Sequence, residues 1–323
     1  MKIFVSGIIS PDSFADNVSF ALKSLGHNVF SSQSLKGNSF LNSVILGHIE
    51  RKINFNGLWN FEKKILSEIR AFKPELFLSV TQNYSPAFLA ELATIVPKRV
   101  MWWGDPISND KRMTLLSKEW TAIFIKDFDS VKKFKIVGRP CYFLNEAMNP
   151  AWHKPLSQQK NSSIVVAGNY YNYRQAITEF LIEKGYEVEL YGSKPPYWAL
   201  PIIHRIHQRR YITREIKSEI FGEGLACLNS FSFYEGNSLN CRAFEIAGAG
   251  GLQLIEYREA VERCFEPGKE VLTFQTQEEL CSLIERAKKE PVQMKKIREA
   301  GVKRALAEHT YLHRLKEIIK IID

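Results

Sequence analysis

The chain has 323 residues and a mass of 37.2 kDa, which is too long for one typical core and suits two domains of ordinary size. Its 45% hydrophobic and 24% charged residues are the values of an ordinary soluble globular protein. The net charge of +9 favours an anionic partner: nucleic acid, an anionic membrane or a phosphate-bearing small molecule.

Short sequence motifs exclude some kinds of site and some of these partners. The five cysteines are scattered and never form a CxxC pair, so we expect neither a disulfide framework nor a zinc site. Zinc-finger spacing and RNA-binding aromatic motifs are absent from the sequence, and nucleic acid is therefore not an expected partner. The opening MKIFVSGIIS suggests a buried strand rather than a signal peptide, and no apolar run approaches the ~20 residues that span a bilayer. We expect a cytoplasmic protein.

The first half of the chain alternates short apolar runs with amphipathic stretches. The apolar runs predict strands over residues 2–6, 28–31, 76–80, 99–103, 122–125 and 141–144. Helical periodicity predicts helices over residues 13–25, 61–72, 85–94 and 130–134. Strands separated by helices indicate right-handed βαβ units and a parallel sheet.

The same pattern restarts after a polar, proline-bearing linker at residues 150–160, which predicts α/β domains over residues 1–155 and 156–308. Strands are predicted over residues 163–167, 187–191, 224–228 and 252–256. Helices are predicted over residues 173–184, 240–247, 278–289, 292–308 and 311–322. Open parallel sheets bind ligands beyond the carboxyl ends of their strands, so two facing sheets would form a cleft for two substrates.

Part of the positive charge lies in residues 204–217 (HRIHQRRYITREIK), which hold five Arg or Lys residues against the single Glu215. The segment is interpreted either as a solvated helix face or as a contact for an anionic acceptor or membrane surface.

Residues 229–256 (NSFSFYEGNSLNCRAFEIAGAGGLQLIE) combine a polar loop, a short helix and a buried strand. A helix start preceded by small polar residues presents free backbone N–H groups and the positive end of the helix dipole, which suits a diphosphate. Arg242 can add a charge-assisted contact, and Glu245, about one turn further, can accept both hydroxyls of a ribose. A plain loop and helix with a surface Arg and Glu is the alternative.

The string N-x-R-x-F-E-I-x-x-x-G-G, from Asn240 to Gly251, resembles the donor-site signature of the CgeB-like (spore-maturation) glycosyltransferases, which belong to the GT-B class. VVAGNYYNYR (165–174) resembles the strand, loop and helix that open the family's donor domain, and ELYGS (189–193) resembles its next strand. EHTYLHRLKEII (308–319) resembles its terminal helix. VMWWGDP and YFLNEAMNPAWHKP, in the first half, fit the family more loosely.

The resemblance implies an α/β fold of the GT-B class, with two Rossmann-like parallel-sheet domains facing an interdomain cleft. Residues 309–323 are then a terminal helix that packs back onto the N-terminal domain. The implied activity moves a sugar from a nucleoside-diphosphate sugar to a cell-surface polysaccharide, glycolipid or protein. The nucleotide sugar is a co-substrate, and neither a cofactor nor a metal is expected. A cytoplasmic enzyme at the inner face of the membrane, in contact through residues 204–217, is compatible with this function.

The resemblance also implies a set of donor-binding residues in the second half. These are Gly168, Asn169, Arg174, Tyr191, Gly192, Ser238, Asn240, Arg242 and Glu245. Glu245 is expected at the ribose, residues 238–242 at the diphosphate, and Tyr191 with Gly192 near the base. A plain turn at Gly168 and a solvated helix residue at Arg174 are the alternatives.

One position departs from the pattern of many retaining GT-B enzymes, which carry two glutamates separated by seven residues. The residue eight positions before Glu245 is Asn237, and Glu235 is out of register. Because the first acid usually contacts the transferred sugar, the donor sugar and the stereochemistry stay open. The one DxD match, Asp127 to Asp129, is interpreted as loop and helix-cap acids rather than a metal site.

The first half supplies candidates for the acceptor side and for catalysis. Asp105 follows a predicted strand and is interpreted as a general base or acceptor ligand, or else as a turn-capping residue. Of Trp102 and Trp103, one is expected in the core and the other facing the cleft, where its ring can stack on a sugar. Asn83 and Tyr84 are expected to line the acceptor groove. Gly7 is expected to let the backbone approach the donor.

Three classes of function are compatible with these sequence features. The first is a nucleotide-sugar-dependent glycosyltransferase. The second is a sugar-nucleotide enzyme that does not transfer, such as an epimerase or a hydrolase. The third is a binding protein, including a catalytically degenerate GT-B chain that acts as a nucleotide-sugar-binding protein or scaffold.

Overall fold

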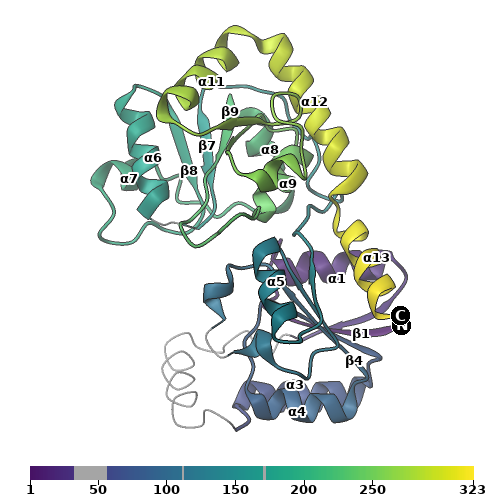
Figure 1. The fold of residues 1–323 in the computed structure, drawn as a ribbon. Helices are drawn as coiled ribbons and strands as arrows, with labels where there is room; N and C mark the ends of the chain where they lie inside the picture. The colour runs from purple at the N-terminus through teal and green to yellow at the C-terminus, as the bar shows by residue number, and fades with distance from the viewer. Residues whose placement is uncertain (33–56, 111–112, 170–171) are drawn as a thin grey trace. The chain divides into compact units, whose positions relative to one another are not determined.

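The computed structural model describes residues 1–32, 57–110, 113–169 and 172–323. The chain forms two compact units, of which unit 1 comprises Met1–Asn145 with Tyr311–Asp323 and unit 2 comprises Glu146–Thr310 (Figure 1). The boundary therefore lies before the expected linker, and residues 146–155 belong to unit 2 rather than to the first domain. The terminal helix is part of unit 1.

Among the described residues, unit 1 has a sheet of six parallel strands in the order β2-β1-β3-β4-β5-β6. The strands are β1 (Lys2–Ser6), β2 (Asn28–Ser31), β3 (Leu76–Val80), β4 (Lys98–Trp103), β5 (Ala122–Ile125) and β6 (Cys141–Phe143). The helices are α1 (Phe14–Ser24), α3 (Asn60–Phe72), α4 (Pro86–Ile95), α5 (Phe128–Ile136) and α13 (Tyr311–Ile322), with short 3-10 turns at Ile107–Asn109 and Thr114–Leu116.

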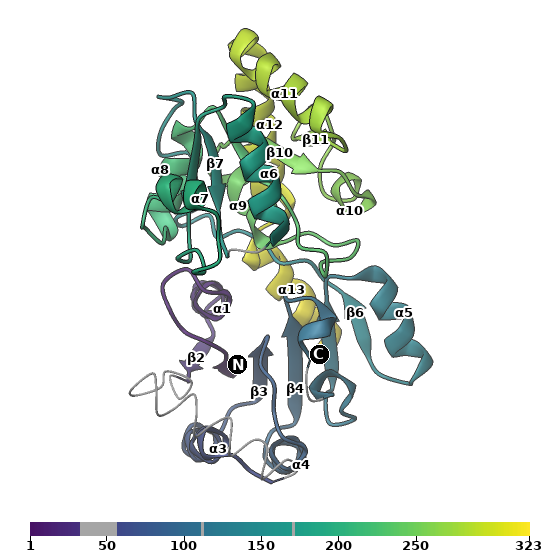
Figure 2. The same ribbon diagram turned by 90° about the vertical axis from the view of Figure 1, so that its left-hand side faces the viewer.

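Both faces of the unit 1 sheet are covered, which explains why β3 is buried throughout and β4 is buried from Val100 to Trp103. Figure 2 shows α1 and α13 on one face and α3 and α4 on the other. On the first face, Tyr311 of α13 packs against Phe14 of α1 and against Trp102, with ring centroids 6.0 Å and 5.9 Å apart.

The described part of unit 2 has a sheet of five parallel strands in the order β11-β10-β9-β7-β8. The strands are β7 (Ile164–Ala167), β8 (Val188–Tyr191), β9 (Ala226–Asn229), β10 (Gln253–Glu256) and β11 (Leu272–Phe274). The helices are α6 (Asn172–Glu183), α7 (Pro201–Ile206), α8 (Arg214–Glu223), α9 (Cys241–Gly248), α10 (Glu259–Glu262), α11 (Gln277–Lys289) and α12 (Pro291–Glu308).

The two-residue period of a strand divides the core of unit 2 into two layers. In β7, Ile164 and Val166 pack with residues of α6, α7 and α11, whereas Val165 and Ala167 pack with residues of α8 and α9. Figure 1 shows α6 and α7 on one side of β7 and β8, and α8 and α9 on the other. Because helices cover both faces of the sheet, the open edge of the sheet is at the carboxyl ends of its strands.

The observed fold confirms the expectation of two α/β halves with parallel sheets. Strand β11 was not predicted, and the basic segment 204–217 is not one helix face. It comprises the end of α7, a non-helical stretch at residues 207–213 and the start of α8. Within the described residues, none of the helices is both long and apolar enough to cross a bilayer.

Candidate functional site in unit 2

The order of the strands in unit 2 marks a ligand-binding position. Strand β7 is the first strand of unit 2 in the sequence, yet it lies inside the sheet, between β8 and β9. The chain leaves β7 towards β8 and later returns on the opposite side to β9, so the connections diverge at the carboxyl ends of β7 and β9. Open α/β sheets bind ligands at this kind of switch point. Here Gly168 follows β7 directly, and the loop after β9 leads into α9.

Two glycines bring the loops after β7 and β8 into backbone contact. Gly168 has a φ of +116° and Gly192 a φ of +124°, a region that strains any residue with a side chain. A Cβ on Gly192 would collide with the carbonyl oxygen of Gly168. Gly168 N donates to Tyr191 O at 3.1 Å, and Ser193 Oγ lies 3.0 Å from Asn169 Oδ1. The two loops therefore form one rigid edge of the site.

Two arginines reach Gly168 from different helices. A Cβ at Gly168 would collide with the guanidinium group of Arg242 and lie 3.3 Å from Arg174 Nη1. Arg174, in α6, is 1% exposed and donates to Asn169 O. Arg242, in the first turn of α9, has an Nε without a hydrogen-bond partner among the described residues. Two guanidinium groups beside a backbone segment that has no side chain at Gly168 suit the oxygens of a phosphate.

The start of α9 is held by a network of buried amides. Asn240 is the N-cap residue, and its Oδ1 accepts from Ala243 N at 3.2 Å. Asn240 Nδ2 donates to Asn229 Oδ1 at 3.0 Å, and Asn229 Nδ2 donates to Gln253 Oε1 at 3.0 Å. These bonds fix α9 to the ends of β9 and β10, and the helix presents the positive end of its dipole there.

Ser238 and Asn240 were expected to bind the diphosphate. Their side chains instead form hydrogen bonds to other groups of the protein. Ser238 is 2% exposed, and its Oγ donates to Glu235 O at 2.6 Å. Asn237 acts in the same way, because its Oδ1 accepts from Ala260 N at 3.0 Å at the start of α10. The loop before α9 is therefore shaped by its own side chains, and its backbone is what remains for a ligand.

Glu245 lies one turn into α9 and is 3% exposed. Its Oε1 is 3.1 Å from Lys217 Nζ of α8 and 3.9 Å from His153 Nε2. Its Oε2 has no hydrogen-bond partner among the described residues. Buried carboxylate oxygens are nearly always hydrogen-bonded, so Oε2 of Glu245 is a candidate acceptor for a hydroxyl donor.

Lys217 and His153 are the two site residues that the sequence did not indicate. Lys217 belongs to the basic segment 204–217, and His153 lies in the linker at residues 150–160. His153 is fully buried, and its Nδ1 accepts from Asn149 N at 3.0 Å. Both contacts to Glu245 join residues far apart in the chain, and no local pattern encodes such contacts.

Neighbouring titratable groups are held in their protonated forms. Burial, followed by the nearby Glu245, raises the pKa of the Cys241 thiol well above its usual range. Burial, assisted by a hydrogen bond to Glu189, also raises the pKa of Tyr191, whose hydroxyl is 2.6 Å from Glu189 Oε2. Cys241 is therefore a protonated thiol and not an activated nucleophile.

The structure corrects three of the acceptor assignments in unit 1. Trp102 and Trp103 are both buried, so neither ring faces the acceptor. Both faces of this parallel sheet are covered by helices, and alternation along β4 therefore exposes neither side chain. Tyr84 is 1% exposed, and its hydroxyl lies 2.7 Å from Ser6 Oγ and 3.0 Å from Ser79 Oγ. It closes the ends of β1 and β3 instead of lining a groove.

The other unit 1 candidates lie in loops that follow strands. Asp105 is exposed just after β4, and Asn83 is half-buried after β3. A Cβ on Gly7 would lie 2.5 Å from Val80 Cγ2 and 3.0 Å from Ala15 Cβ, so the close approach at Gly7 is to the protein's own side chains. Asp127 caps α5 by accepting from Asp129 N at 3.3 Å, as expected for the DxD match.

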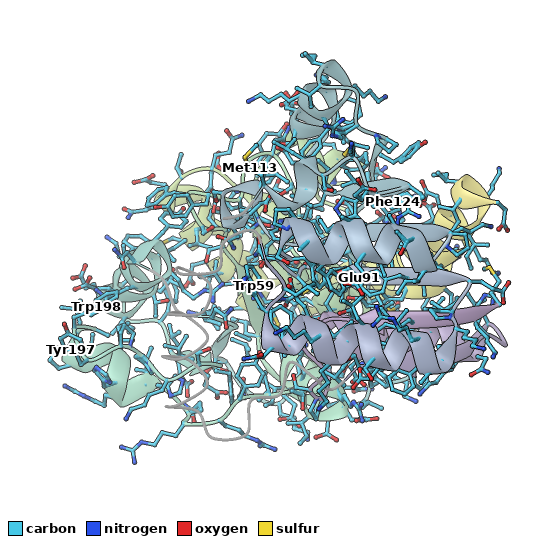
Figure 3. All side chains as sticks on the ribbon, turned by 90° about the horizontal axis from the view of Figure 1, so that it is seen from below. Trp59, Glu91, Met113, Phe124, Tyr197 and Trp198 are labelled. Carbon is cyan, nitrogen blue, oxygen red and sulfur yellow. The ribbon has the colours of Figure 1, made fainter. Side chains whose placement is uncertain are left out.

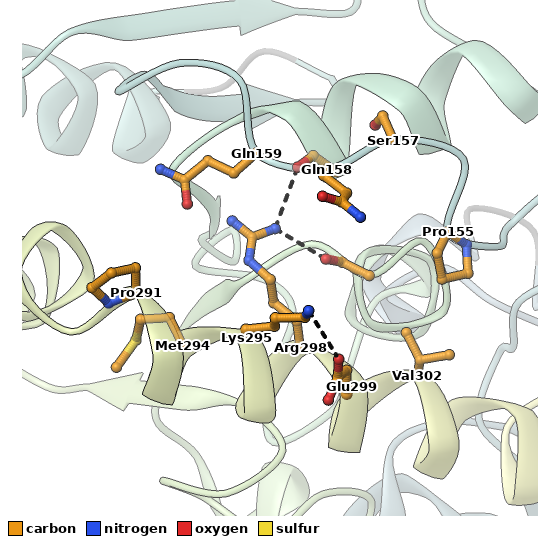
Figure 4. Close-up of a pocket in the computed structure, with 12 residues that line it drawn as sticks. Pro155, Ser157, Gln158, Gln159, Pro291, Met294, Lys295, Arg298, Glu299 and Val302 are labelled. Atoms are coloured by element: carbon orange, nitrogen blue, oxygen red, sulfur yellow. Dashed lines mark hydrogen bonds and ion pairs between the residues drawn. The ribbon is translucent and has the colours of Figure 1, made fainter.

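Unit 2 also contains a cavity of about 330 Å³ that involves none of the expected donor residues (Figure 4). Arg298 of α12 points into it and donates to the carbonyl oxygens of Gly250, Gly224 and Leu225 at 2.8–3.0 Å. Its guanidinium is thus used to hold the ends of α8 and α9. We assign a structural role to this arginine.

Solved structures with the same fold are numerous, and three illustrate the match. Sucrose-phosphate synthase from Thermosynechococcus elongatus superposes with a TM-score of 0.70 at 10% identity, covering 99% of this chain and 98% of that chain. HepE from Anabaena, solved in complex with UDP-glucose, gives 0.66 at 10% identity over 99% of each chain. A glycosyltransferase from Rickettsia africae gives 0.64 at 12% identity, covering 99% and 97%. No curated protein matches the sequence.

The sequence itself matches one protein family. The match covers residues 152–320, which is more than half of the chain and includes every donor-site residue described above. Together with the two parallel sheets of the GT-B class, this match establishes that the chain belongs to the glycosyl transferase-like family.

Proposed function

We propose that this protein is a glycosyltransferase that binds a nucleoside-diphosphate sugar in unit 2 and transfers the sugar to a glycan, lipid-linked or protein acceptor. The observation that carries the proposal is the pair of guanidinium groups at Gly168, at the switch point of the unit 2 sheet. Positive charge and a side-chain-free backbone at the end of β7 are combined with a helix start after the neighbouring β9. That combination fits a diphosphate.

Each part of the donor has a place in this arrangement. The diphosphate binds between Arg242, Arg174 and the start of α9. One of its oxygens accepts a hydrogen bond from Nε of Arg242, which has no partner among the described residues. The ribose hydroxyls donate to Oε2 of Glu245, while Lys217 holds Oε1. The base lies beside the Gly168–Gly192 contact. UDP is the first nucleotide to test, because HepE, which shares this fold, was solved in complex with UDP-glucose.

The transfer follows from this placement. An acceptor hydroxyl attacks the anomeric carbon of the sugar, the bond from that carbon to the diphosphate oxygen breaks, and the nucleoside diphosphate leaves. Arg174, Arg242 and the helix dipole stabilise the charge that develops on the leaving group, so we propose that no metal is needed. Asp105 is the general base that accepts the hydroxyl proton in an inverting reaction, and Asn83 contacts the acceptor.

The proposal also includes the type of glycosyltransferase and the place of the protein in the cell. The motif from Asn240 to Gly251 supports the CgeB-like type of glycosyltransferase. A cytoplasmic enzyme at the inner face of the membrane has access to both a nucleotide sugar and a growing surface glycan.

A catalytically degenerate donor-binding protein is the second candidate. Asn237 stands where many retaining enzymes have their first glutamate, and its side chain caps α10. Such a chain would bind the nucleotide sugar without transferring it.

Calorimetric titration with UDP, GDP, dTDP, CDP and CMP, with and without magnesium, tests the donor site. We expect one diphosphate to bind independently of metal, and Glu245→Gln to weaken it on the order of tenfold through loss of the charged acceptor. Absence of binding to every nucleotide would overturn the proposal. Transfer of radiolabelled sugar to a lysate then separates the enzyme from the degenerate protein, and Asp105→Asn is expected to lower transfer while leaving donor affinity unchanged.

A further inference from the structure

The loop between β8 and α7 exposes two neighbouring aromatic side chains. Tyr197 is 95% exposed and Trp198 is 50% exposed, and Figure 3 shows them close together, directed away from the ribbon of unit 2. All six tryptophans lie in the described residues, and the other five are buried. Adjacent exposed rings of this size mark an interaction surface more often than isolated exposed residues do.

Positive charge surrounds this aromatic pair. From Leu190 to Arg214 the sequence contains no Asp or Glu. The exposed residues of this stretch include four cations and a third aromatic ring, and we call them the 194–211 surface: Lys194, Tyr197, Trp198, Arg205, Arg209, Arg210 and Tyr211. Its charge is complementary to an anionic partner.

The 194–211 surface is presented by a well-anchored framework. Ala199 and Ile203 are buried in the core that α6 and α7 share with the sheet. Gly192 N donates to Arg210 O at 3.0 Å, and Arg209 N donates to His207 Nδ1 at 3.0 Å. Proline residues at 195, 196 and 201 restrict the backbone on both sides of the aromatic pair. The exposed rings therefore project from a fixed backbone.

We propose that the 194–211 surface binds the headgroup region of an anionic lipid bilayer. Tyr and Trp concentrate at the membrane–water interface because their rings are apolar and their N–H or O–H groups are polar. Lys and Arg beside them are attracted to anionic headgroups. The surface thus combines the two elements of interfacial binding, buried apolar rings and basic side chains. This inference goes beyond the glycosyltransferase activity and does not depend on it.

Trp198 makes the proposal directly measurable in the full-length protein. As the exposed tryptophan, it dominates the part of the emission that aqueous quenchers reach. Vesicles of phosphatidylcholine mixed with an equal amount of phosphatidylglycerol are expected to shift this emission to shorter wavelength and protect it from acrylamide. Lipids with brominated acyl chains are expected to quench it. Vesicles of phosphatidylcholine alone are expected to have no effect, and Trp198→Phe should lose the signal but still sediment with anionic vesicles.

Vesicle co-sedimentation with matched variants locates the surface. Tyr197→Ser with Trp198→Ser, and separately Arg205→Gln with Arg209→Gln and Arg210→Gln, are each expected to lower binding at least tenfold, as a rough estimate from the contribution of each basic residue and ring. The controls lie on unit 1, where Ile136 and Val137 are exposed and Lys132, Lys133 and Lys135 carry an equal charge. Replacing both Ile136 and Val137 by Ser, or all three lysines by Gln, should leave vesicle binding unchanged.

Three results would overturn the proposal. The first is equal binding to neutral and anionic vesicles. The second is loss of vesicle binding in the unit 1 controls but not in the variants of the 194–211 surface. The third is absence of vesicle binding combined with binding of a polyanion such as heparin or RNA, which would assign the same surface to an anionic polymer. Nucleotide affinity, measured in parallel, should stay at the wild-type value in all these variants and shows that each is folded.

Discussion

The carboxyl ends of β1 and β7 occupy equivalent positions in the two units, yet they are built differently. Each strand comes first in its unit, lies inside its sheet and is followed directly by a glycine. Gly7 of unit 1 is enclosed by Val80 and Ala15. Gly168 of unit 2 has a φ of +116° and is faced by two guanidinium groups.

The two strand ends differ in the charge of the side chains that surround them. In unit 1 the strand ends are closed by the Tyr84 hydroxyl and two serines, without a charged group among these contacts. In unit 2 the strand ends gather two arginines at Gly168 and a lysine at Glu245. The same topology therefore serves as a packed core in one unit and as a charged site in the other.

The largest effect is expected from Lys217→Met. Glu245 is 3% exposed, and removal of its cation leaves a buried carboxylate without charge compensation, which costs about 4 kcal/mol of unfolding free energy. Urea unfolding measures this loss. Adding Glu245→Gln should restore most of it. Lys160→Met, which removes a lysine from an exposed pair with Glu223, should leave stability unchanged.

Arg242→Met is expected to act on the ligand rather than on the fold. Loss of one guanidinium from the site should weaken diphosphate binding on the order of a hundredfold, the value of a strong charge-assisted contact. Calorimetry measures the affinity. The exposed Arg263→Met is the control and should bind normally. Unchanged affinity in Arg242→Met would place the diphosphate elsewhere.

Gly192→Ala tests the contact between the two loops of unit 2. Gly192 and Gly185 both have positive φ, but a Cβ at Gly185 meets nothing within 4 Å, whereas at Gly192 it collides with Gly168 O. Gly185→Ala should cost about 1 kcal/mol for the backbone conformation alone. Gly192→Ala should cost about 2 kcal/mol more and weaken nucleotide binding, as an estimate for a steric clash in packed surroundings. Equal thermal unfolding of the two variants would contradict the loop contact.

The smallest effect is expected from Tyr84→Phe in unit 1. Loss of the hydroxyl bonds to Ser6 and Ser79 should cost about 1 kcal/mol and leave nucleotide affinity unchanged. Burial raises the pKa of Tyr84 above its usual 10, so the folded protein keeps a proton that the unfolded chain releases. Stability should therefore fall above pH 10, and less steeply in Tyr84→Phe. A loss of nucleotide binding in this variant would remove the contrast between the units.

Local patterns predicted every described strand except β11, most helices and the donor loop, because these depend on apolar runs and on glycine in loops. Gly168 and Gly192 were indicated by the resemblance to the CgeB-like family rather than by a local pattern, and both have positive φ. Strand β11 was missed because its three residues are too short a run to stand out beside the helix that follows. Trp102 and Trp103 were misjudged because helices cover both faces of the sheet, which strand alternation alone cannot show.

Long-range contacts account for the remaining differences. Lys217 reaches Glu245 from a preceding helix, and the buried Asn229 holds Asn240 in the same way. In sequence these are a surface lysine and two loop asparagines. Only the packing of α8, α9 and β9 makes them part of one site.

Hydrogen exchange of the full chain with and without the bound diphosphate tests the central claim most directly. Binding in unit 2 predicts slower exchange in residues 168–169, 192–193 and 238–242, and no change in residues 7–9 or 81–84 after β1 and β3. Protection confined to unit 1, or binding without protection at the end of β7, would contradict the assignment of the donor to the charged strand ends of unit 2.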